Sequence, residues 1–489
     1  MLQTSLSSLI AAVKPLQVAG STSKVITDVI CDSRKAQQGV LFVAVRGVAV
    51  DAHKFIPQVI AAGATAIVCE ALPAELDPSV TYVQVPDSTI ALALLASEWF
   101  GRPSEQLKLV GVTGTNGKTT IASLLHRLAQ LLGYKAGLLS TVKNIIDTTE
   151  IPAVQTTPDP LSLNKMLYDM VQAGCDYAFM EVSSHSVVQH RIDGLVFSGA
   201  VFTNLTRDHL DFHKTVDNYI RAKKGFFDML PADAFALANA DDKQGPVMMQ
   251  NTKASKHLYS LRSLAEFQAK IVESRLSGTT LNINGRELEV LFTGRFNAYN
   301  LLAVYGAAIL IGWDVEEVLV KMSLLVPVAG RFQTFTSPRG YTAIVDYAHT
   351  PDALVNVLSS ISDVMAGKGQ IITVVGCGGN RDKGKRPIMA QEAARRSHKL
   401  ILTSDNPRFE EPDDILNDMV AGLDDDQLAH AFRIADRKEA IRLACQIATP
   451  GDVILVAGKG HEDYQEIRGV KHHFDDSEVL AEIFKSEKR

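Results

Sequence analysis

The sequence has few cysteines, and they form no pattern. Of its 489 residues only five are cysteine: Cys31, Cys69, Cys175, Cys377 and Cys445. No two of them make a Cys-x-x-Cys pair, and an odd number of scattered cysteines suits neither a disulfide framework nor a zinc site. We therefore expect reduced thiols in a protein of the cytoplasm.

Long apolar runs, repeats and an excess of positive charge are also missing. No uninterrupted apolar run reaches membrane-spanning length, and Met1–Ser5 lacks the basic start of a signal peptide. The formal net charge of -6 argues against a protein that binds nucleic acids or membrane surfaces through its overall charge. We expect small-molecule partners, no nucleic acid, no membrane, and a cytoplasmic monomer.

The residues that are present describe a globular protein of several domains. Hydrophobic residues make up 46% and charged residues 21% of the chain, and its length is too great for one core. Strand-like and helix-like segments alternate throughout, which predicts an α/β fold. We divide the chain into a small N-terminal α/β domain (1–101), a central domain with a mostly parallel sheet (102–330) and a C-terminal Rossmann-like domain (331–489).

A glycine-rich turn between a buried strand and a helix is the most informative segment. Leu107–Val112 reads as the strand, and the apolar residues from Ile121 to Leu132 fall on one helix face. The turn between them, Gly114–Thr120, has the Gly-Lys-Thr of a P-loop, although Val112 replaces the first glycine of the strict pattern. Backbone amides, the helix N-terminus and Lys118 would bind phosphates. The alternative is an ordinary strand–helix turn, which Gly-Lys-Thr disfavours.

Other predicted strands also end in polar or glycine-rich loops, where α/β proteins bind ligands. We expect a hairpin with its turn at Asn284–Gly285, a long helix from Asn297 to Ile311, and the following buried strands: Val40–Val45, Ala64–Val68, Tyr177–Val182, Gly199–Thr203, Ala343–Asp346, Ile371–Val375, Lys399–Thr403 and Val453–Ala457.

Two residues just past strand ends in the central region are candidate magnesium ligands. Glu181 supplies a carboxylate, the usual ligand for this ion, whereas His209 is a less usual one. The residues alone favour a structural, hydrogen-bonded role for the histidine. Lys223 and Lys224 both share helix faces with apolar residues, so spacing does not choose between the two lysines. The alternative is that both are solvated lysines whose aliphatic stems lie over apolar surface.

Three loops of the third region suit a substrate that is both an amine and a carboxylate. Arg381 and Arg408 lie in loops after neighbouring predicted strands, and arginine binds carboxylates with two parallel hydrogen bonds. Asp405 and Asn406 can accept bonds from an ammonium group. Each loop alone could be merely a solvated surface loop. Together they predict an ATP-dependent enzyme with a separate pocket for an amino acid-like substrate.

In these motifs the chain resembles the Mur ligase family. The match runs nearly end to end, through Asp32–Arg34, Gly111–Thr120, Glu181–Arg191, Asn204–Asp211, Gly294–Asn297, Asp346–Pro351, Asp405–Arg408 and Gly458–Tyr464. The family also uses the relaxed P-loop. The resemblance implies a three-domain ligase of peptidoglycan precursor synthesis that uses ATP and Mg²⁺ to form an amide through an acyl phosphate.

The resemblance also assigns roles to residues. ATP would contact Gly114, Thr115, Asn116, Gly117, Lys118, Thr119, Thr120, Asn297, Arg331 and Asp346. UDP-N-acetylmuramoyl-L-alanyl-D-glutamate would contact Cys31, Ser33, Val48, Ala49, Val50, Gln155, Thr156, Thr157, Ser183, Gln189 and Arg191. Meso-diaminopimelate would contact Arg381, Asp405, Asn406, Pro407, Arg408, Gly458 and Glu462. Magnesium would be held by Thr119, Glu181, His209 and Lys223, the last as a carbamate (N6-carboxylysine), which reverses the structural reading of His209. Lys118, Glu181, His209 and Lys223 would be catalytic.

The form of the Asp405–Arg408 motif bears on the second substrate. In the family, Asp-Asn-Pro-Arg accompanies meso-diaminopimelate, whose second carboxylate lysine lacks, and Arg408 can pair with that carboxylate. Ala52 departs from the glycine that relatives commonly have. The alternatives are a lysine-adding or folylpolyglutamate-type ligase of the same superfamily, or a non-catalytic nucleotide-binding protein. The motif and the N-terminal Asp32–Arg34 argue against the first two, and the intact catalytic set argues against the third.

Overall fold

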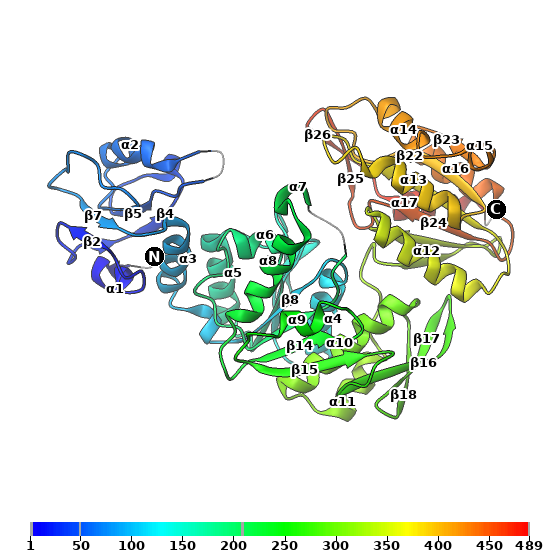
Figure 1. Cartoon of the computed structure of the whole chain (residues 1–489), viewed down its shortest axis with the longest axis horizontal. Coiled ribbons are helices and arrows are strands. Elements are labelled where there is room, and N and C mark those ends of the chain that lie inside the picture. Colours follow the sequence, from blue (N-terminus) through cyan, green and yellow to red (C-terminus); the bar gives the residue numbers. More distant parts are fainter. Residues whose placement is uncertain (1–2, 48–49, 207–209, 488–489) are drawn as a thin grey trace.

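The structure, a computed structural model, describes residues 3–47, 50–206 and 210–487. Predictions for Val48, Ala49 and His209 therefore lie outside the described residues. Three sheets follow one another along the chain, and Figure 1 shows them side by side, from the N-terminal sheet through the central one to the C-terminal one. Our domain boundaries near residues 101 and 330 stay a prediction.

The N-terminal sheet has five strands in the order β2-β7-β6-β5-β4. They are β2 (Gln17–Ala19), β4 (Asp28–Ile30), β5 (Val40–Val43), β6 (Ala66–Cys69) and β7 (Thr81–Gln84). Only β2 runs antiparallel to its neighbour. The helices α1 (Leu6–Ile10) and α3 (Ser88–Trp99) pack on one face, and α2 (Ile56–Ala61) packs on the other. A small ladder joins β1 (Thr4–Ser5) to β3 (Val25–Ile26).

The central sheet has eleven strands in the order β11-β10-β9-β12-β8-β13-β14-β15-β16-β17-β18. Its parallel part comprises β8 (Lys108–Thr113), β9 (Ala136–Leu139), β12 (Tyr177–Glu181), β13 (Gly199–Phe202), β14 (Phe235–Asn239), β15 (Ser255–Ser260) and β16 (Phe267–Arg275). Antiparallel strands extend both edges: β10 (Lys143–Ile146), β11 (Thr149–Pro152), β17 (Gly278–Ile283) and β18 (Arg286–Val290).

Helices cover both faces of this sheet, because its central strands are apolar on both sides. One face carries α4 (Lys118–Leu131), α10 (Arg295–Ile311) and α11 (Val315–Met322). The other carries α5 (Pro160–Gln172), α8 (Val216–Asp228) and α9 (Gly245–Met248). Two short helices, α6 (Ser184–Val188) and α7 (Leu210–His213), lie near α8. Since β8 is in the middle of the parallel strands, the P-loop turn that follows it lies at the centre of the sheet's carboxyl edge.

The C-terminal sheet has six strands in the order β19-β20-β24-β21-β22-β23. They are β19 (Gln333–Thr336), β20 (Thr342–Asp346), β21 (Ile371–Cys377), β22 (Lys399–Ser404), β23 (Ala431–Arg433) and β24 (Val453–Ala457), and only β19 is antiparallel. The helices α12 (Pro351–Met365), α13 (Lys385–Arg396) and α14 (Pro412–Val420) cover one face. The other face carries α16 (Arg437–Ile447) and α17 (Asp476–Glu487). A hairpin of β25 (Tyr464–Ile467) and β26 (Val470–His473) and the short α15 (Asp425–Leu428) complete the described elements.

The strand and helix predictions agree with these elements to within a few residues. The hairpin turn falls at Asn284–Gly285, where Ile283 pairs with Arg286. The chain is packed where it enters the central domain, because Pro103 and Ser104 are buried and the Ser104 hydroxyl accepts a hydrogen bond from Val196 N. The prediction of reduced thiols agrees with five unpaired cysteines, all of them in the described segments. None of the described helices is both long and apolar enough to cross a membrane.

One buried titratable group lies on the helix that follows the P-loop. The His126 side chain is on α4, inside the core under the sheet. Burial disfavours the charged imidazolium and lowers the pKa of His126 to about 4. In the unfolded chain the pKa of a histidine is about 6.5. Below that pH the unfolded state takes up a proton that the folded state does not, so His126 makes the protein less stable as the pH falls from 6.5 towards 4.

We therefore expect His126→Gln to weaken the acid sensitivity of folding. Glutamine is similar in size and does not titrate, so between pH 7 and pH 5 the variant should lose about 2 kcal/mol less unfolding free energy than the wild type. Urea unfolding at the two pH values measures this difference. Equal losses in the two proteins would show that His126 is not a neutral group in the fold.

Candidate active site

The turn after β8 has no room for side chains at its glycines. Gly114 has φ 149° and Gly117 has φ 89°. A Cβ on Gly114 would lie 1.8 Å from Thr203 Oγ1, and one on Gly117 would lie 2.5 Å from Asn300 Oδ1. The two glycines are therefore required both by backbone conformation and by close packing. They allow the turn to present its amides at the N-terminus of α4.

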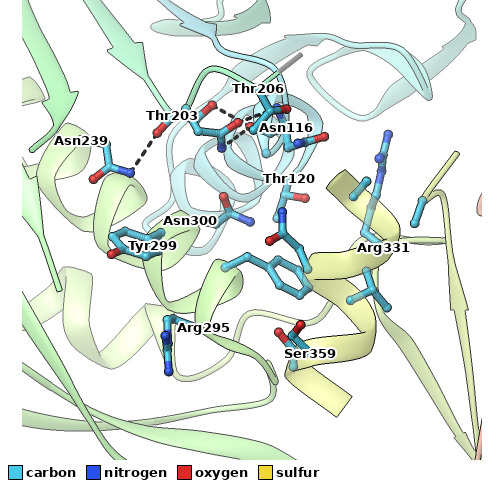
Figure 2. A pocket seen from close by; sticks show the side chains of 18 of the residues that line it. Asn116, Thr120, Thr203, Thr206, Asn239, Arg295, Tyr299, Asn300, Arg331 and Ser359 are labelled. Carbon is cyan, nitrogen blue, oxygen red and sulfur yellow. Dashed lines mark hydrogen bonds between the residues drawn. The ribbon is translucent and has the colours of Figure 1, made fainter. Parts of the chain in front are cut away.

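Neighbouring loops hold the turn in place. Thr203 Oγ1 donates to the Asn116 carbonyl (2.6 Å), and Asn204 Oδ1 accepts from Asn116 N (3.0 Å). Figure 2 shows Asn116 and Thr203 close together at one end of a cleft. The Lys118 Nζ donates to the carbonyls of Gly114 (3.0 Å) and Thr115 (2.9 Å). The loop after β13 thus positions the turn, which the sequence did not indicate.

A cleft of about 380 Å³ lies between the central and C-terminal sheets. Five of the ten residues predicted to contact ATP line it: Asn116, Gly117, Thr120, Arg331 and Asp346. Figure 2 shows Arg331 opposite Thr120, with Asn300 and Tyr299 of α10 along the cleft. Asn297 does not line the cleft itself. Its Oδ1 accepts a hydrogen bond from Nδ2 of Asn300 (3.3 Å), which does line the cleft. The remaining four belong to the turn itself.

Arg331 connects the C-terminal sheet to the P-loop. Its Nη2 donates to Thr119 Oγ1 (3.3 Å), and its guanidinium carbon lies 4.5 Å from the centre of the Tyr347 ring. The buried Asp346 accepts hydrogen bonds from Phe332 N (2.7 Å) and Ala348 N (2.8 Å), and burial raises its pKa. Phe332 follows Arg331 in the chain, and Asp346, followed by Tyr347, is the last residue of β20. The hydrogen bond between Phe332 and Asp346 therefore holds the Arg331 segment against the end of β20.

A second group of polar residues contacts the turn from the other side. Glu181 ends β12 beside β8, is almost fully buried, and accepts from Thr141 N (2.8 Å). Lys223 Nζ donates to the Gly114 carbonyl (2.7 Å). Tyr219 lies one helical turn before it, with its hydroxyl 3.1 Å from Thr115 Oγ1.

The choice between the two lysines of α8 is now resolved. Lys223 is 1% exposed and contacts the P-loop. The Lys224 side chain is 13% exposed and pairs with Asp228 on the outer side of the helix (2.6 Å). The physical difference is direction: adjacent residues on a helix point about 100° apart, so only one of them reaches the turn.

The residues around the turn fit a magnesium ion. Glu181 and Thr119 are oxygen ligands of the kind that Mg²⁺ prefers. Within the described segments no three histidine, cysteine or acidic side chains gather closely enough to hold a metal by themselves. The predicted site, in which Glu181 and Thr119 combine with phosphate oxygens and a carbamate on Lys223, stays a prediction. The predicted fourth ligand, His209, is outside the described residues.

Five of the residues predicted to contact the UDP-linked dipeptide form one hydrogen-bonded cluster. Arg191 Nη1 donates to Gln155 Oε1 and to the Thr157 carbonyl (both 2.6 Å), and its Nη2 donates to Gln189 Oε1 (2.6 Å). Thr157 Oγ1 donates to the Glu181 carbonyl (2.8 Å) and accepts from Ser183 N (3.2 Å). The cluster is therefore attached directly to the strand that carries Glu181.

The residues of the N-terminal domain that are predicted to contact the UDP-linked dipeptide lie closer to this cluster than their separation in the sequence suggests. Burial and the nearby Asp159 carboxylate raise the pKa of the Cys31 thiol to about 11. The same carboxylate acts on Arg191, whose pKa burial lowers. The Asp159 carboxylate therefore acts electrostatically on both side chains. Ser33 is in a short 3-10 helix close to Cys31, and Val50 is exposed. Thr156 accepts from Thr141 Oγ1 (3.0 Å).

The predicted diaminopimelate residues come together where β22, β21 and β24 end. Asn406 Nδ2 donates to Glu462 Oε2 (2.8 Å), joining the loop after β22 to the loop after β24. The buried Lys459 donates to the same Glu462 oxygen (3.2 Å) and to Asn406 Oδ1 (3.3 Å). A Cβ on Gly458 would lie 2.7 Å from Asp405 Oδ2, so this position must be glycine for the loops to meet.

The two arginines of this site are neighbours. Arg408 has φ 52°; its Nη1 donates to the Gly379 carbonyl (2.9 Å), and its Nε lies 3.3 Å from Glu466 Oε2. A Cβ on Gly378 would lie 2.9 Å from Arg408 Nη1 and 3.7 Å from Arg381 Cγ. Pro407 also packs tightly there, since a Cβ on Gly379 would meet its carbonyl at 1.9 Å. The loops thus bring the side chains of Arg381 and Arg408 to the same point, next to Gly378.

Sequence reasoning missed the groups that support these loops. Arg386 is buried and donates to both oxygens of Glu410 (2.9 Å each) and to the Gly378 carbonyl (3.3 Å), and it holds the pKa of Glu410 at about 2. Lys459 plays a similar part on the opposite side. A charged residue among apolar neighbours on α13 was the available signal for Arg386; Lys459 gave none.

Comparison with known proteins agrees with this arrangement. Three family models match consecutive parts of the chain: "Mur ligase family, catalytic domain" at residues 25–99, "Mur ligase middle domain" at 112–308 and "Mur ligase, glutamate ligase domain" at 330–460. A protein of Bacteroides fragilis is 60% identical over 98% of this chain and 99% of its own length. The chain belongs to the Mur ligase family.

Further relatives support the same assignment of this Mur ligase. A protein of Parabacteroides distasonis is 62% identical over 98% of this chain and 99% of its own. Both relatives are named UDP-N-acetylmuramoyl-L-alanyl-D-glutamate–2,6-diaminopimelate ligase. A solved structure of a protein with that name has a TM-score of 0.72 and 32% identity, covering 100% of both chains. The family and the three-domain α/β fold predicted from the sequence are confirmed.

The contrast between Lys223 and Lys224 gives this Mur ligase a matched pair of variants. We expect Lys223→Ala to lose almost all ligase activity, because it removes the side chain that reaches the P-loop, and added bicarbonate should not restore it. Lys224→Ala should retain activity, because Lys224 pairs with Asp228 within its own helix and its amine points away from the P-loop, and such an i,i+4 pair contributes at most about 1 kcal/mol. Initial rates and thermal unfolding of both variants measure this. Equal activity in the two would contradict the role given to Lys223.

Proposed function

We propose that this chain joins meso-diaminopimelate to the D-glutamyl γ-carboxylate of UDP-N-acetylmuramoyl-L-alanyl-D-glutamate, using ATP and forming an amide. The names of the two relatives and of the solved structure describe those proteins as ligases of UDP-N-acetylmuramoyl-L-alanyl-D-glutamate and 2,6-diaminopimelate. The observation that supports it here is the convergence of Arg381, Arg408, Asp405 and Glu462 at neighbouring strand ends. They suit a substrate that carries both ammonium and carboxylate groups.

A free carboxylate does not react with an amine, because its charge repels nucleophiles and oxide is a poor leaving group. Phosphorylation by ATP turns the oxygen into part of a phosphate, which leaves readily. The P-loop amides, Lys118 and Arg331 would stabilise the charge on the phosphoryl group as it is transferred. The Arg191 cluster, bonded to the strand of Glu181, would hold the dipeptide carboxylate next to it.

Glu181, Thr119 and a carbamate on Lys223 would hold the magnesium ion at this edge of the sheet. When bound, the ion supplies positive charge that offsets the phosphate oxygens. The Lys223 side chain must change from a cation to an anion to become a metal ligand, because the unmodified ammonium group donates a hydrogen bond to the Gly114 carbonyl. A carbamate is an anion on the same stem. Carbamylation would therefore exchange a bond to the turn for one to the ion.

The second half of the reaction needs an amine at the acyl phosphate. Asp405, Asn406 and Glu462 would accept the ammonium group of diaminopimelate that does not react, and Arg408 with Arg381 would bind its carboxylates. The attacking amine then displaces phosphate and leaves an amide. Because the reacting groups come from different sheets, positioning carries much of the rate enhancement, and we expect the C-terminal domain to close over the P-loop.

The test of this function is ADP release from ATP by the purified chain. Release should require both the UDP-dipeptide and meso-diaminopimelate, and the product should be the UDP-linked tripeptide, identified by mass. L-lysine in place of diaminopimelate should lower kcat/KM at least about tenfold, because it lacks the second carboxylate. Equal rates with lysine would indicate the lysine-adding activity. Release that depends on neither substrate would exclude a ligase.

We expect Arg408→Ala to raise the KM for diaminopimelate by about tenfold to a hundredfold, the loss of one bidentate charged contact. The KM for ATP should change little, since the nucleotide cleft is lined by other residues. Arg395→Ala is a suitable control, because that arginine is half exposed on α13 and pairs only locally with Glu392. An equal rise in the KM for ATP would count against this site.

A further inference from the structure

Arg437 is a fully buried arginine that no step of the reaction above uses. It is the first residue of α16, and its side chain is completely enclosed, as is that of Asp476 at the start of α17. Arg437 Nε and Nη2 donate to the two oxygens of Asp476 (2.7 Å each). The Nη2 also donates to the Ala457 carbonyl (3.0 Å), and Nη1 makes a longer contact to the Ser404 carbonyl (3.5 Å).

The two carbonyls are the last of their strands. Ser404 ends β22, immediately before the Asp405–Arg408 loop, and Ala457 ends β24, immediately before Gly458. In the sheet, β21 separates these strands, so no backbone hydrogen bond joins β22 to β24. One guanidinium group therefore connects the exact points from which both substrate loops leave the sheet. Its planar fork can bond several acceptors at once in a fixed geometry.

The charge of Arg437 also links the loop after β22 to the loop after β24. Burial opposes the charged form of Arg437, but Asp476, Asp405 and Glu462 together raise its pKa. Arg437 therefore interacts electrostatically with one carboxylate from each loop. This attraction favours the arrangement in which both loops lie close to the guanidinium group.

We propose that Arg437 is a positioning residue for the amino-acid substrate. It sets the spacing between the loop after β22 and the loop after β24 through their terminal carbonyls. This inference rests on the proposed function, because it takes the two loops to be the diaminopimelate site. Turnover of the wild type with diaminopimelate tests that function. The role of Arg437 is tested by the change in the KM for diaminopimelate between variants. The proposal for Arg437 can therefore be wrong even if the wild type has the proposed function.

The competing explanation is that the Arg437–Asp476 pair only stabilises the fold. Buried ion pairs can often be replaced together by apolar residues without loss of stability, whereas removing one partner leaves an unpaired charge. A paired apolar replacement therefore separates the two explanations. It can preserve folding while it abolishes the contacts to the strand-end carbonyls.

The decisive variant is the double replacement Arg437→Met with Asp476→Leu. We expect a folded protein whose KM for diaminopimelate is raised at least about tenfold, while the KM values for ATP and the UDP-dipeptide stay within about twofold. Arg437→Lys keeps the charge but loses the fork and should give a smaller rise in the same KM only. Circular dichroism and thermal unfolding accompany the kinetics.

Glu487→Gln is the matched control, because Glu487 is on the same helix as Asp476 and bonds Tyr341 and Ser337 away from the substrate loops. It should leave the KM for diaminopimelate unchanged even where it lowers the unfolding temperature. An unchanged KM in the folded Arg437 variants would overturn the proposal, as would an equal rise for all three substrates. Failure of both Arg437 variants to fold would assign the pair a purely structural role.

Discussion

Gly114 leaves β8 with φ 149°, and the space that a Cβ would occupy there is filled by Thr203. This close approach fixes the turn against β13, and the parallel pairing of β8 with β12 brings Glu181 to the same edge. The same turn receives Lys223 from α8 and Arg331 from the chain that leads into the C-terminal sheet. The residues predicted to bind phosphate, metal and dipeptide therefore share one reference point, the backbone of this turn.

The nucleotide cleft and the amino-acid loops are physically continuous. Arg331 stacks on Tyr347, and the Tyr347 ring lies 5.0 Å from the ring of His461, which precedes Glu462. A Cβ on Gly330 would lie 2.1 Å from the backbone of Gly460, so the two segments touch directly. Burial and then the charge of Arg331 lower the pKa of His461 to about 4, and the ring is neutral at neutral pH. A neutral ring can pack beside the Arg331 cation without a second positive charge.

The parts predictable from the sequence are those encoded by local pattern. Buried strands, the P-loop turn and the Asn284–Gly285 hairpin follow from apolar runs and glycine positions, and they were placed to within a few residues. The hydrogen-bond and ion-pair partners of the site residues were not predictable, because they depend on which strands become neighbours in the sheet. Thr203 supports Asn116 from 87 residues away, and Asp476 meets Arg437 from 39 residues away. Spacing could not separate Lys223 from Lys224 either, since both lie near apolar residues and only the sheet decides which direction is inward.

If the amino-acid substrate binds as proposed, its selection depends on the contacts that Arg408 makes when the substrate is absent. A site whose buried donor is left unpaired by the wrong ligand rejects that ligand by a factor of about 10⁴ to 10⁵. Arg408, however, is already bonded to Gly379 O and close to Glu466. When lysine binds, Arg408 keeps these partners, so little desolvation penalty falls on the wrong substrate. The second carboxylate of diaminopimelate must instead compete with Glu466 for the guanidinium. Discrimination by Arg408 is then a difference between two ion pairs, and the exposed Arg381 beside it supplies the additional charge that favours the substrate.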